Sequence, residues 1–261
     1  MTPLQHNMLS TLHDGEYCYF TKFEMLRETL IEIMKKRKPC IVISGNSDYV
    51  HDQDSVTWMM ENTSVKHFYA QNLVYNGSNT YQVPLGITNV TDCARGLEHG
   101  VNHSDKPKHA NKMKYMHDDG STPSRLIYAN FRLSTNMQQR RLCASACKTA
   151  PFTTYEEHGQ DLDTYFKQCR DHKMIVCPDG NGPDTHRMWE TLYIGRVPIV
   201  LNKPGIEQFR GLPVVWVNDW RELARPDIIT DKYEEAKGKS KDMIYKEYWI
   251  EHITQKLKEI K

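Results

Sequence analysis

Residues 177–190 combine glycines, a histidine, an arginine and acidic residues at a spacing that suits the binding of a phosphorylated ligand. Gly180 and Gly182 permit unusual backbone torsions and allow a ligand to approach the backbone closely. The pattern that follows predicts a helix over residues 184–195, and a helix N-terminus offers free N–H groups and a partial positive charge. This combination favours phosphate.

Two charged side chains of this predicted helix suggest how a nucleotide would be held. Arg187 falls in the first turn, where a cation is unfavourable against the helix dipole unless an anion lies beside it. Glu190 follows three residues later on the same face and could accept hydrogen bonds from two ribose hydroxyls. The alternative is that Asp184 only caps the helix and that Arg187 and Glu190 form an exposed ion pair.

A second polar cluster occupies residues 46–52, directly after an apolar run that predicts a strand. Open α/β sheets bind their ligands beyond the carboxyl ends of such strands. A reaction that activates a hydroxyl group needs a base, and Asp48 is the first candidate, with His51 and Asp52 behind it. The alternative is an ordinary polar loop.

Short apolar runs alternate with helical patterns along the chain, which predicts an α/β fold with helices packed on mostly parallel sheets. The expected strands are residues 40–44, 65–70, 82–87, 125–131, 174–177, 197–201 and 214–217. The expected helices are residues 23–36, 55–60, 135–148, 162–172 and 184–195, followed by a largely helical stretch over residues 231–261.

A polar stretch at residues 98–124 separates the two halves and is expected to be a linker with a surface helix. Its histidines have irregular spacing, which favours a solvated connector over a metal site. We therefore expect an N-terminal domain over residues 1–117, a C-terminal domain over residues 118–230, and a terminal helix over residues 231–261 that packs back on the N-terminal domain.

The overall composition excludes several classes of protein. A net charge of +1 over 261 residues gives no long-range attraction to nucleic acid or anionic membrane. The N-terminus lacks a basic and apolar leader pattern, and no apolar run approaches the roughly 18 residues that cross a bilayer. Seven cysteines, an odd number, favour reduced thiols. These features favour a cytoplasmic protein. We also expect a monomer or a weak homodimer.

The run from Gly180 to Glu190, followed by Leu192 to Val200, resembles the donor-binding signature of exostosin-like glycosyltransferases. Residues 41–49, 66–72 and 82–89 are similar to the N-terminal half of compact, soluble members encoded by large algal viruses, for which the host cytoplasm would be the compartment. The resemblance covers about residues 38–218 and implies the GT-B fold, in which two Rossmann-like domains with parallel sheets face a central cleft.

The resemblance also implies an activity and a set of site residues. The donor would be a nucleotide diphosphate sugar, usually of UDP, with UDP-xylose, glucuronate, galactose and N-acetylglucosamine as candidates. The acceptor would be a glycan hydroxyl, and transfer would be inverting, without a cofactor or metal. Arg132, after the strand at residues 125–131, would be the second cation on the diphosphate, ahead of Arg125, Arg140 and Arg141. The remaining donor-binding residues would be Asp179, Gly180, Asn181, Gly182, Asp184, His186, Arg187 and Glu190.

Other interpretations of the sequence are weaker or remain open. The chain contains no G-x-G-x-x-G after its first strand and no P-loop, which argues against a dehydrogenase and a P-loop enzyme. The D-x-D patterns at residues 52–54 and 161–163 could bind a metal, but acids are also favourable at helix N-termini. A non-catalytic module that binds a nucleotide sugar or carbohydrate would keep Arg187 and Glu190 and would need no base.

Overall fold

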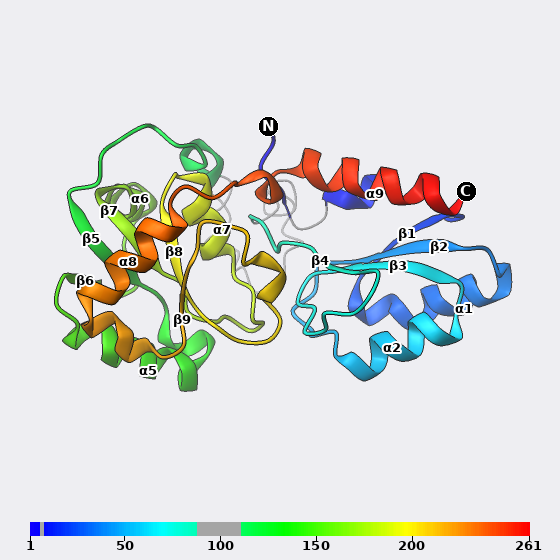
Figure 1. The fold of residues 1–261 in the computed structure, drawn as a ribbon, viewed down its shortest axis with the longest axis horizontal. Coiled ribbons are helices and arrows are strands. Elements are labelled where there is room, and N and C mark those ends of the chain that lie inside the picture. Colours follow the sequence, from blue (N-terminus) through cyan, green and yellow to red (C-terminus); the bar gives the residue numbers. More distant parts are fainter. Residues whose placement is uncertain (6–7, 88–110) are drawn as a thin grey trace.

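Short apolar segments of the chain form two separate parallel sheets, each in its own lobe (Figure 1). The computed structural model describes residues 1–5, 8–87 and 111–261. The N-terminal sheet has the order β1-β2-β3-β4, with β1 Cys18–Thr21, β2 Cys40–Ser44, β3 Val65–Ala70 and β4 Thr80–Gln82. The C-terminal sheet has the order β6-β5-β7-β8-β9, with β5 Arg125–Asn130, β6 Thr153–Glu156, β7 His172–Val176, β8 Val197–Leu201 and β9 Val215–Val217. The predicted α/β class with parallel sheets is confirmed.

Helices cover both faces of the N-terminal sheet, which explains why β2 is a continuous apolar run. Val42 packs on one face with residues of α1 Leu26–Lys36 and α2 Gln53–Asn62. Ile41 and Ile43 point to the other face, where they pack with Trp249 and Ile253 of α9 Lys246–Ile260. The short 3-10 helix η1 Met8–Leu12 joins this second layer.

The C-terminal sheet is covered in the same way. One face packs with α5 Met137–Thr149 and α8 Pro226–Ala236, and the other packs with α6 Leu162–Asp171 and α7 His186–Tyr193. The strand order reverses at β5, because β6 lies on one side of it and β7 on the other. Such a switch point leaves a crevice at the carboxyl ends of the two strands that flank it, where open α/β sheets bind ligands.

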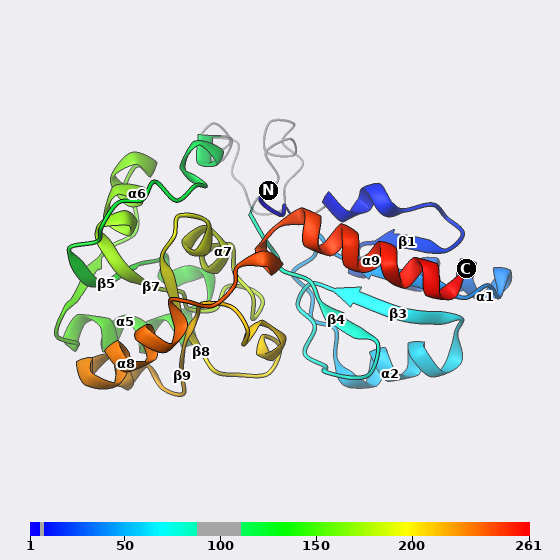
Figure 2. The same ribbon diagram turned by 45° about the horizontal axis from the view of Figure 1, so that its top comes forward.

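The two ends of the chain connect the lobes. After η7 Asp242–Ile244, α9 lies along the N-terminal sheet, as Figures 1 and 2 show. The N-terminal segment runs between the lobes: Leu4 N–H donates to the Tyr193 hydroxyl over 2.8 Å, and Pro3 bridges to Tyr245. Residues from both chain termini therefore fix how the lobes meet.

Several expected elements differ from the structure. Strands β1 and β6 were not predicted, and the strand expected at residues 82–87 is instead β4 Thr80–Gln82. The helix expected from residue 184 begins at His186, because Thr185 is its N-cap. Of the expected connector, residues 98–110 lie outside the described residues, and the rest includes η3 Asn111–Tyr115. Among the described helices, none has both the length and the apolarity to span a membrane.

Candidate functional site

Arg140 forms hydrogen bonds with the segments that follow β5 and β7, the two strands on either side of the switch point. This arginine of α5 is 7% exposed; its Nε donates to the Asp179 carbonyl and its Nη1 to the Arg132 carbonyl, each over 2.7 Å. Asn136, the N-cap of α5, donates to the Gly180 carbonyl over 3.0 Å. Burial, together with the positive charge of Arg187, lowers the pKa of Arg140 to about 10. A buried cation therefore lies directly behind the glycine-bearing turn, although the sequence favoured Arg132 over it.

The turn itself is fixed by contacts on both sides. Gly180 N–H donates to the Gly182 carbonyl over 3.2 Å, and the Asp179 carboxylate forms an ion pair with Lys203. A Cβ atom on Gly182 would lie 2.5 Å from Oδ1 of Asn72, which belongs to the N-terminal lobe. The need for glycine at position 182 thus comes from the close approach of the two lobes.

Asp184 is buried and hydrogen-bonded within the protein, although the resemblance placed it among the donor ligands. Its side chain is 3% exposed, and its two carboxylate oxygens accept hydrogen bonds from Leu85 N–H over 2.7 Å and Trp189 Nε1 over 2.8 Å. Burial raises its pKa to about 7, against the effect of these hydrogen bonds. Both oxygens are occupied by the protein, so this carboxylate holds the turn against the N-terminal lobe.

Arg187 lies in the first turn of α7 and has a neutral partner. Its Nη1 donates to the Tyr165 hydroxyl over 2.8 Å, and the guanidinium lies 5.3 Å from the centre of the Tyr165 ring. Within the described part of the chain, no carboxylate lies at ion-pair distance from Arg187. The exposed Arg187–Glu190 ion pair that the sequence left open is therefore not formed.

Glu190 pairs instead with a lysine that the sequence did not suggest. Its Oε1 lies 2.7 Å from Nζ of Lys112 in η3, and the residue is 5% exposed. Burial acts to raise the pKa of Glu190, but Lys112, His186 and Arg187 outweigh it, so the pKa is lowered. Lys112 is 78 residues away along the chain, and no local pattern connects the two residues.

His186 and Arg132 occupy opposite environments. The Nδ1 atom of His186 lies 2.7 Å from the Gly86 carbonyl of the N-terminal lobe, and burial lowers the pKa of its imidazole. Arg132 follows β5 as the residue before η4 Leu133–Thr135, and its side chain is exposed. His186 thus contributes to the contact between the lobes, and Arg132 faces solvent after the carboxyl end of β5.

The predicted base lies across the lobe boundary from the turn. Asp48 is exposed in the loop that follows β2, and its Oδ2 accepts a hydrogen bond from Asn181 Nδ2 over 3.0 Å. Next to this contact, Nδ2 of Asn72 donates a hydrogen bond to the Ser47 carbonyl over 3.1 Å. The fold therefore brings together two candidates that are separated by 133 residues in the sequence.

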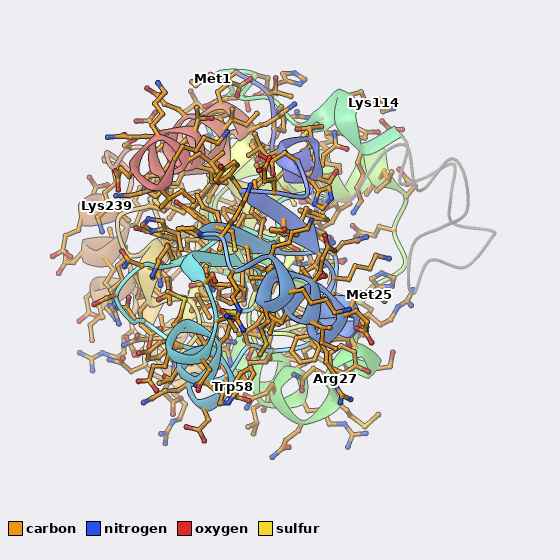
Figure 3. The ribbon with its side chains drawn as sticks, turned by 90° about the vertical axis from the view of Figure 1, so that its right-hand side faces the viewer. Met1, Met25, Arg27, Trp58, Lys114 and Lys239 are labelled. Atoms are coloured by element: carbon orange, nitrogen blue, oxygen red, sulfur yellow. The ribbon has the colours of Figure 1, made fainter. Side chains whose placement is uncertain are left out.

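His51, the second candidate for the base, is buried and does not share the exposed position of Asp48. It is 2% exposed, its Nε2 lies 2.9 Å from the Ser44 hydroxyl, and burial lowers its pKa to about 4. It lines an apolar cavity of about 630 Å³ between α1 and α2. The same cavity is lined by Arg27 and Trp58, which Figure 3 shows on neighbouring helices of the N-terminal lobe. His51 is thus part of the interior of that lobe.

Both D-x-D patterns begin helices. Asp52 caps α2 by accepting from Ser55 N–H, and Asp161 caps α6 by accepting from Thr164 N–H. Among the described residues, no group of three or more His, Cys, Asp or Glu side chains is arranged to hold a metal ion. In this chain the two patterns are explained by helix capping.

Comparison of the chain with protein-family models and with curated proteins found no match.

Proposed function

We propose that the chain is a GT-B glycosyltransferase that moves a sugar from a nucleotide diphosphate sugar to a hydroxyl of a glycan acceptor. One observation carries this proposal: the Arg187 guanidinium lies in the first turn of α7 with a neutral hydroxyl as its hydrogen-bond partner. A cation at the positive end of a helix is unfavourable unless an anion binds beside it. A diphosphate provides that anion.

The surroundings of Arg187 support a nucleotide at this position. The turn lies at the reversal of strand order between β5 and β7, where nucleotides bind in doubly wound sheets. Arg140 adds a second positive charge behind the turn. Glu190 lies about one helical turn after Arg187 on α7, so a ligand whose diphosphate binds Arg187 could extend its ribose toward Glu190. UDP is the nucleotide we propose, as the sequence resemblance implies, with the sugar among those named above.

The Asp48–Asn181 contact supports transfer rather than binding alone. In the proposed reaction the acceptor oxygen attacks the anomeric carbon of the sugar as the bond from that carbon to the diphosphate oxygen breaks. Asp48 takes the proton of the acceptor hydroxyl, and Arg187 with the α7 N-terminus stabilises the charge on the departing diphosphate. Attack from the face opposite the leaving group inverts the anomeric configuration.

A non-catalytic nucleotide-sugar module is the second candidate, and it would share the donor site. Such a module needs no carboxylate at the mouth of that site, whereas the exposed Asp48 is within hydrogen-bond distance of the donor turn. Release of UDP from a UDP-sugar, with or without an acceptor, distinguishes the two.

Thermal unfolding in the presence of UDP, UDP-sugars and other nucleotides tests the donor site directly. A ligand at one hundred times its dissociation constant stabilises the folded state by about 2.7 kcal/mol. We expect UDP and at least one UDP-sugar to raise the melting temperature. If no nucleotide diphosphate raises it, the proposal is wrong.

A further inference from the structure

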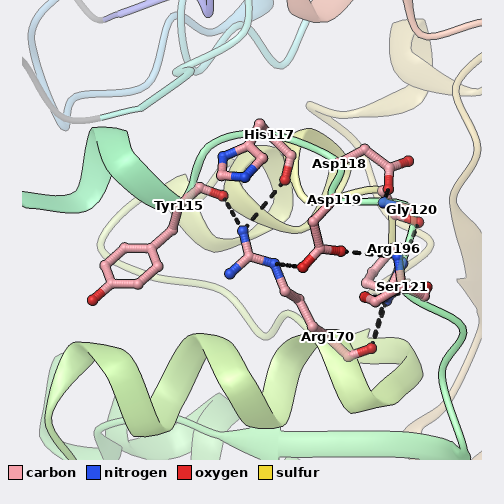
Figure 4. Close-up of polar contacts among 9 residues, drawn as sticks. Tyr115, His117, Asp118, Asp119, Gly120, Ser121, Arg170 and Arg196 are labelled. Carbon is pink, nitrogen blue, oxygen red and sulfur yellow. Dashed lines mark hydrogen bonds and ion pairs between the residues drawn. The ribbon is translucent and has the colours of Figure 1, made fainter.

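Two arginines hold the connector that enters the C-terminal lobe (Figure 4). Arg170 donates to the Tyr115 carbonyl over 2.9 Å, and its Nε lies 3.0 Å from the Asp119 carboxylate. Arg196 donates to the carbonyl of Ser121 over 2.9 Å and to its hydroxyl over 2.7 Å. We call these five residues the connector clamp. The sequence predicted a solvated connector here, but the clamp fixes its backbone to α6 and to the start of β8.

Aromatic packing also fixes η3, which precedes the clamp. The Tyr115 ring stacks on Phe166 of α6, with ring centroids 4.5 Å apart and an angle of 17° between the planes. The Tyr115 hydroxyl donates to Asp163. Because Tyr115 is 7% exposed, η3 has a buried anchor of its own. Lys112 lies one turn of η3 before this anchor, so its backbone has a defined place relative to α6 and α7.

From this position on η3, Lys112 forms an ion pair with Glu190. The side chains of the two residues are 19% and 6% exposed, and the Nζ–Oε1 distance is 2.7 Å. Among the described residues, Oε2 of Glu190 has no hydrogen-bond partner. One carboxylate oxygen is therefore held by the protein, and the second remains able to accept hydrogen bonds from a ligand.

We propose that Lys112 is a positioning residue of the nucleotide site, which holds the Glu190 carboxylate through Oε1 and thereby presents Oε2 to the ribose hydroxyls of a nucleoside diphosphate. This inference rests on the proposed function. It adds a residue that lies outside the donor-binding run of residues 180–190 and comes from the connector between the lobes. The clamp then has a role, because it sets the position from which the lysine reaches the carboxylate.

The electrostatics of Glu190 agree with this role. Burial acts to raise its pKa, and the attraction of Lys112 is the strongest opposing effect, followed by His186 and Arg187. Among the described residues, the other titratable side chains around it are Tyr165 and Cys169 of α6 and Cys177 after β7, all neutral at neutral pH. Without Lys112 the balance moves toward the protonated acid, which loses its strength as an acceptor.

The test measures the affinity for UDP and for the UDP analogue that lacks both ribose hydroxyls, by calorimetric titration of the full chain. Lys112→Met should weaken UDP about tenfold, the effect of losing one charge-assisted hydrogen bond. It should leave the affinity for the analogue unchanged, because the analogue has no hydroxyl to present to Glu190. Lys112→Arg should restore most of the preference for UDP.

Lys114→Met is the matched control, because Lys114 lies on the same short helix and pairs with the exposed Asp163. It should leave both affinities unchanged. Loss of Lys112 should raise the pKa of Glu190 in the Lys112→Met variant. The affinity of this variant for UDP should therefore fall as the pH is lowered through that pKa, whereas the wild type keeps its affinity over the same pH range.

The results separate this inference from the proposed function. If the wild type binds neither UDP nor the analogue, both are wrong. If the wild type prefers UDP and Lys112→Met keeps that preference and its pH profile, the role of Lys112 is refuted and the donor site stands. If Lys112→Met loses affinity for UDP and the analogue equally, Lys112 acts on the fold or the diphosphate, and the inference is also refuted.

Discussion

Replacement of Arg187 by methionine should affect folding and ligand binding in different ways. Methionine keeps the length and the apolar packing on Tyr165 but removes the charge. The substitution deletes one hydrogen bond and one cation–π interaction at 5.3 Å. Each contributes about 1 kcal/mol, and the desolvation of the half-buried guanidinium offsets part of this stabilisation. The free energy of unfolding without ligand should therefore fall by about 1 kcal/mol.

The effect on a bound diphosphate should be much larger. Two unit charges about 4 Å apart attract each other by about 4 kcal/mol at an effective dielectric constant of about 20. Arg140 and the α7 N-terminus remain and still attract the ligand, so the net loss should be smaller, about 3 kcal/mol. That loss corresponds to an increase of about one hundredfold in the dissociation constant of UDP.

Calorimetric titration with UDP and thermal unfolding without ligand measure the two effects. Arg210→Met is a matched control, because Arg210 also lies over an aromatic ring, 5.5 Å from the centroid of Trp216, and also donates to a neutral oxygen, that of Asn202. It should leave UDP binding unchanged. The reasoning is refuted if Arg187→Met binds UDP as well as the wild type does, or if Arg210→Met loses as much affinity.

Three further predictions concern the exposed Asp48, the turn glycine Gly182, and the buried ionisable side chains of Asp184 and His51. Asp48→Asn should keep donor affinity and abolish sugar transfer, measured by titration and by UDP release; continued turnover would exclude Asp48 as the base. Gly182→Ala should destabilise the fold by about 1–3 kcal/mol, because its Cβ would lie 2.5 Å from Asn72, and the double variant with Asn72→Ala should recover most of this loss in thermal unfolding. Burial raises the pKa of Asp184 from 3.8 to about 7, so the folded state binds this proton more tightly, and the contribution of Asp184 to stability falls as the pH rises from 3.8 to about 7. Burial lowers the pKa of His51 from 6.5 to about 4, so the unfolded state binds this proton more tightly, and the contribution of His51 to stability rises as the pH rises from about 4 to 6.5. Denaturant unfolding against pH should show a more positive slope in Asp184→Asn and a less positive slope in His51→Gln, and equal slopes would contradict both assignments.

The sequence predicted the central strands well and the edge strands β1, β4 and β6 poorly. Strands β2, β3 and β8 have the predicted bounds, because burial on both faces produces continuous apolar runs. The edge strand β6 reads Thr-Thr-Tyr-Glu and is half-buried throughout, so it gives no such signal. Residues 83–87 are buried and give an apolar run, but Pro84 lacks a backbone donor, and the strand ends at Gln82.

The candidate site was predictable only where its parts are local in the sequence. The glycine-bearing turn and the first turn of α7 follow from residues 180–190. The partners that decide what each side chain does come from elsewhere in the fold: Tyr165 for Arg187, Lys112 for Glu190 and Leu85 for Asp184. The family resemblance placed Asp184 in the donor site, and the sequence could not test this, because a carboxylate near a helix N-terminus has the same sequence signature whether it meets solvent or a buried N–H group.

Three residues of this loop contact the N-terminal lobe, and the two that flank them are the ones available to the proposed ligand. Gly182, Asp184 and His186 meet the N-terminal lobe, through Asn72, Leu85 and Gly86 respectively. On either side of these three residues in the sequence, Asn181 is exposed, and Arg187 donates to the Tyr165 hydroxyl of α6. A diphosphate that binds at the turn would compete with Asp48 for the amide of Asn181. Donor binding would then free the carboxylate of Asp48 for the acceptor hydroxyl, so the same contact that joins the lobes without ligand would order the two steps of the reaction.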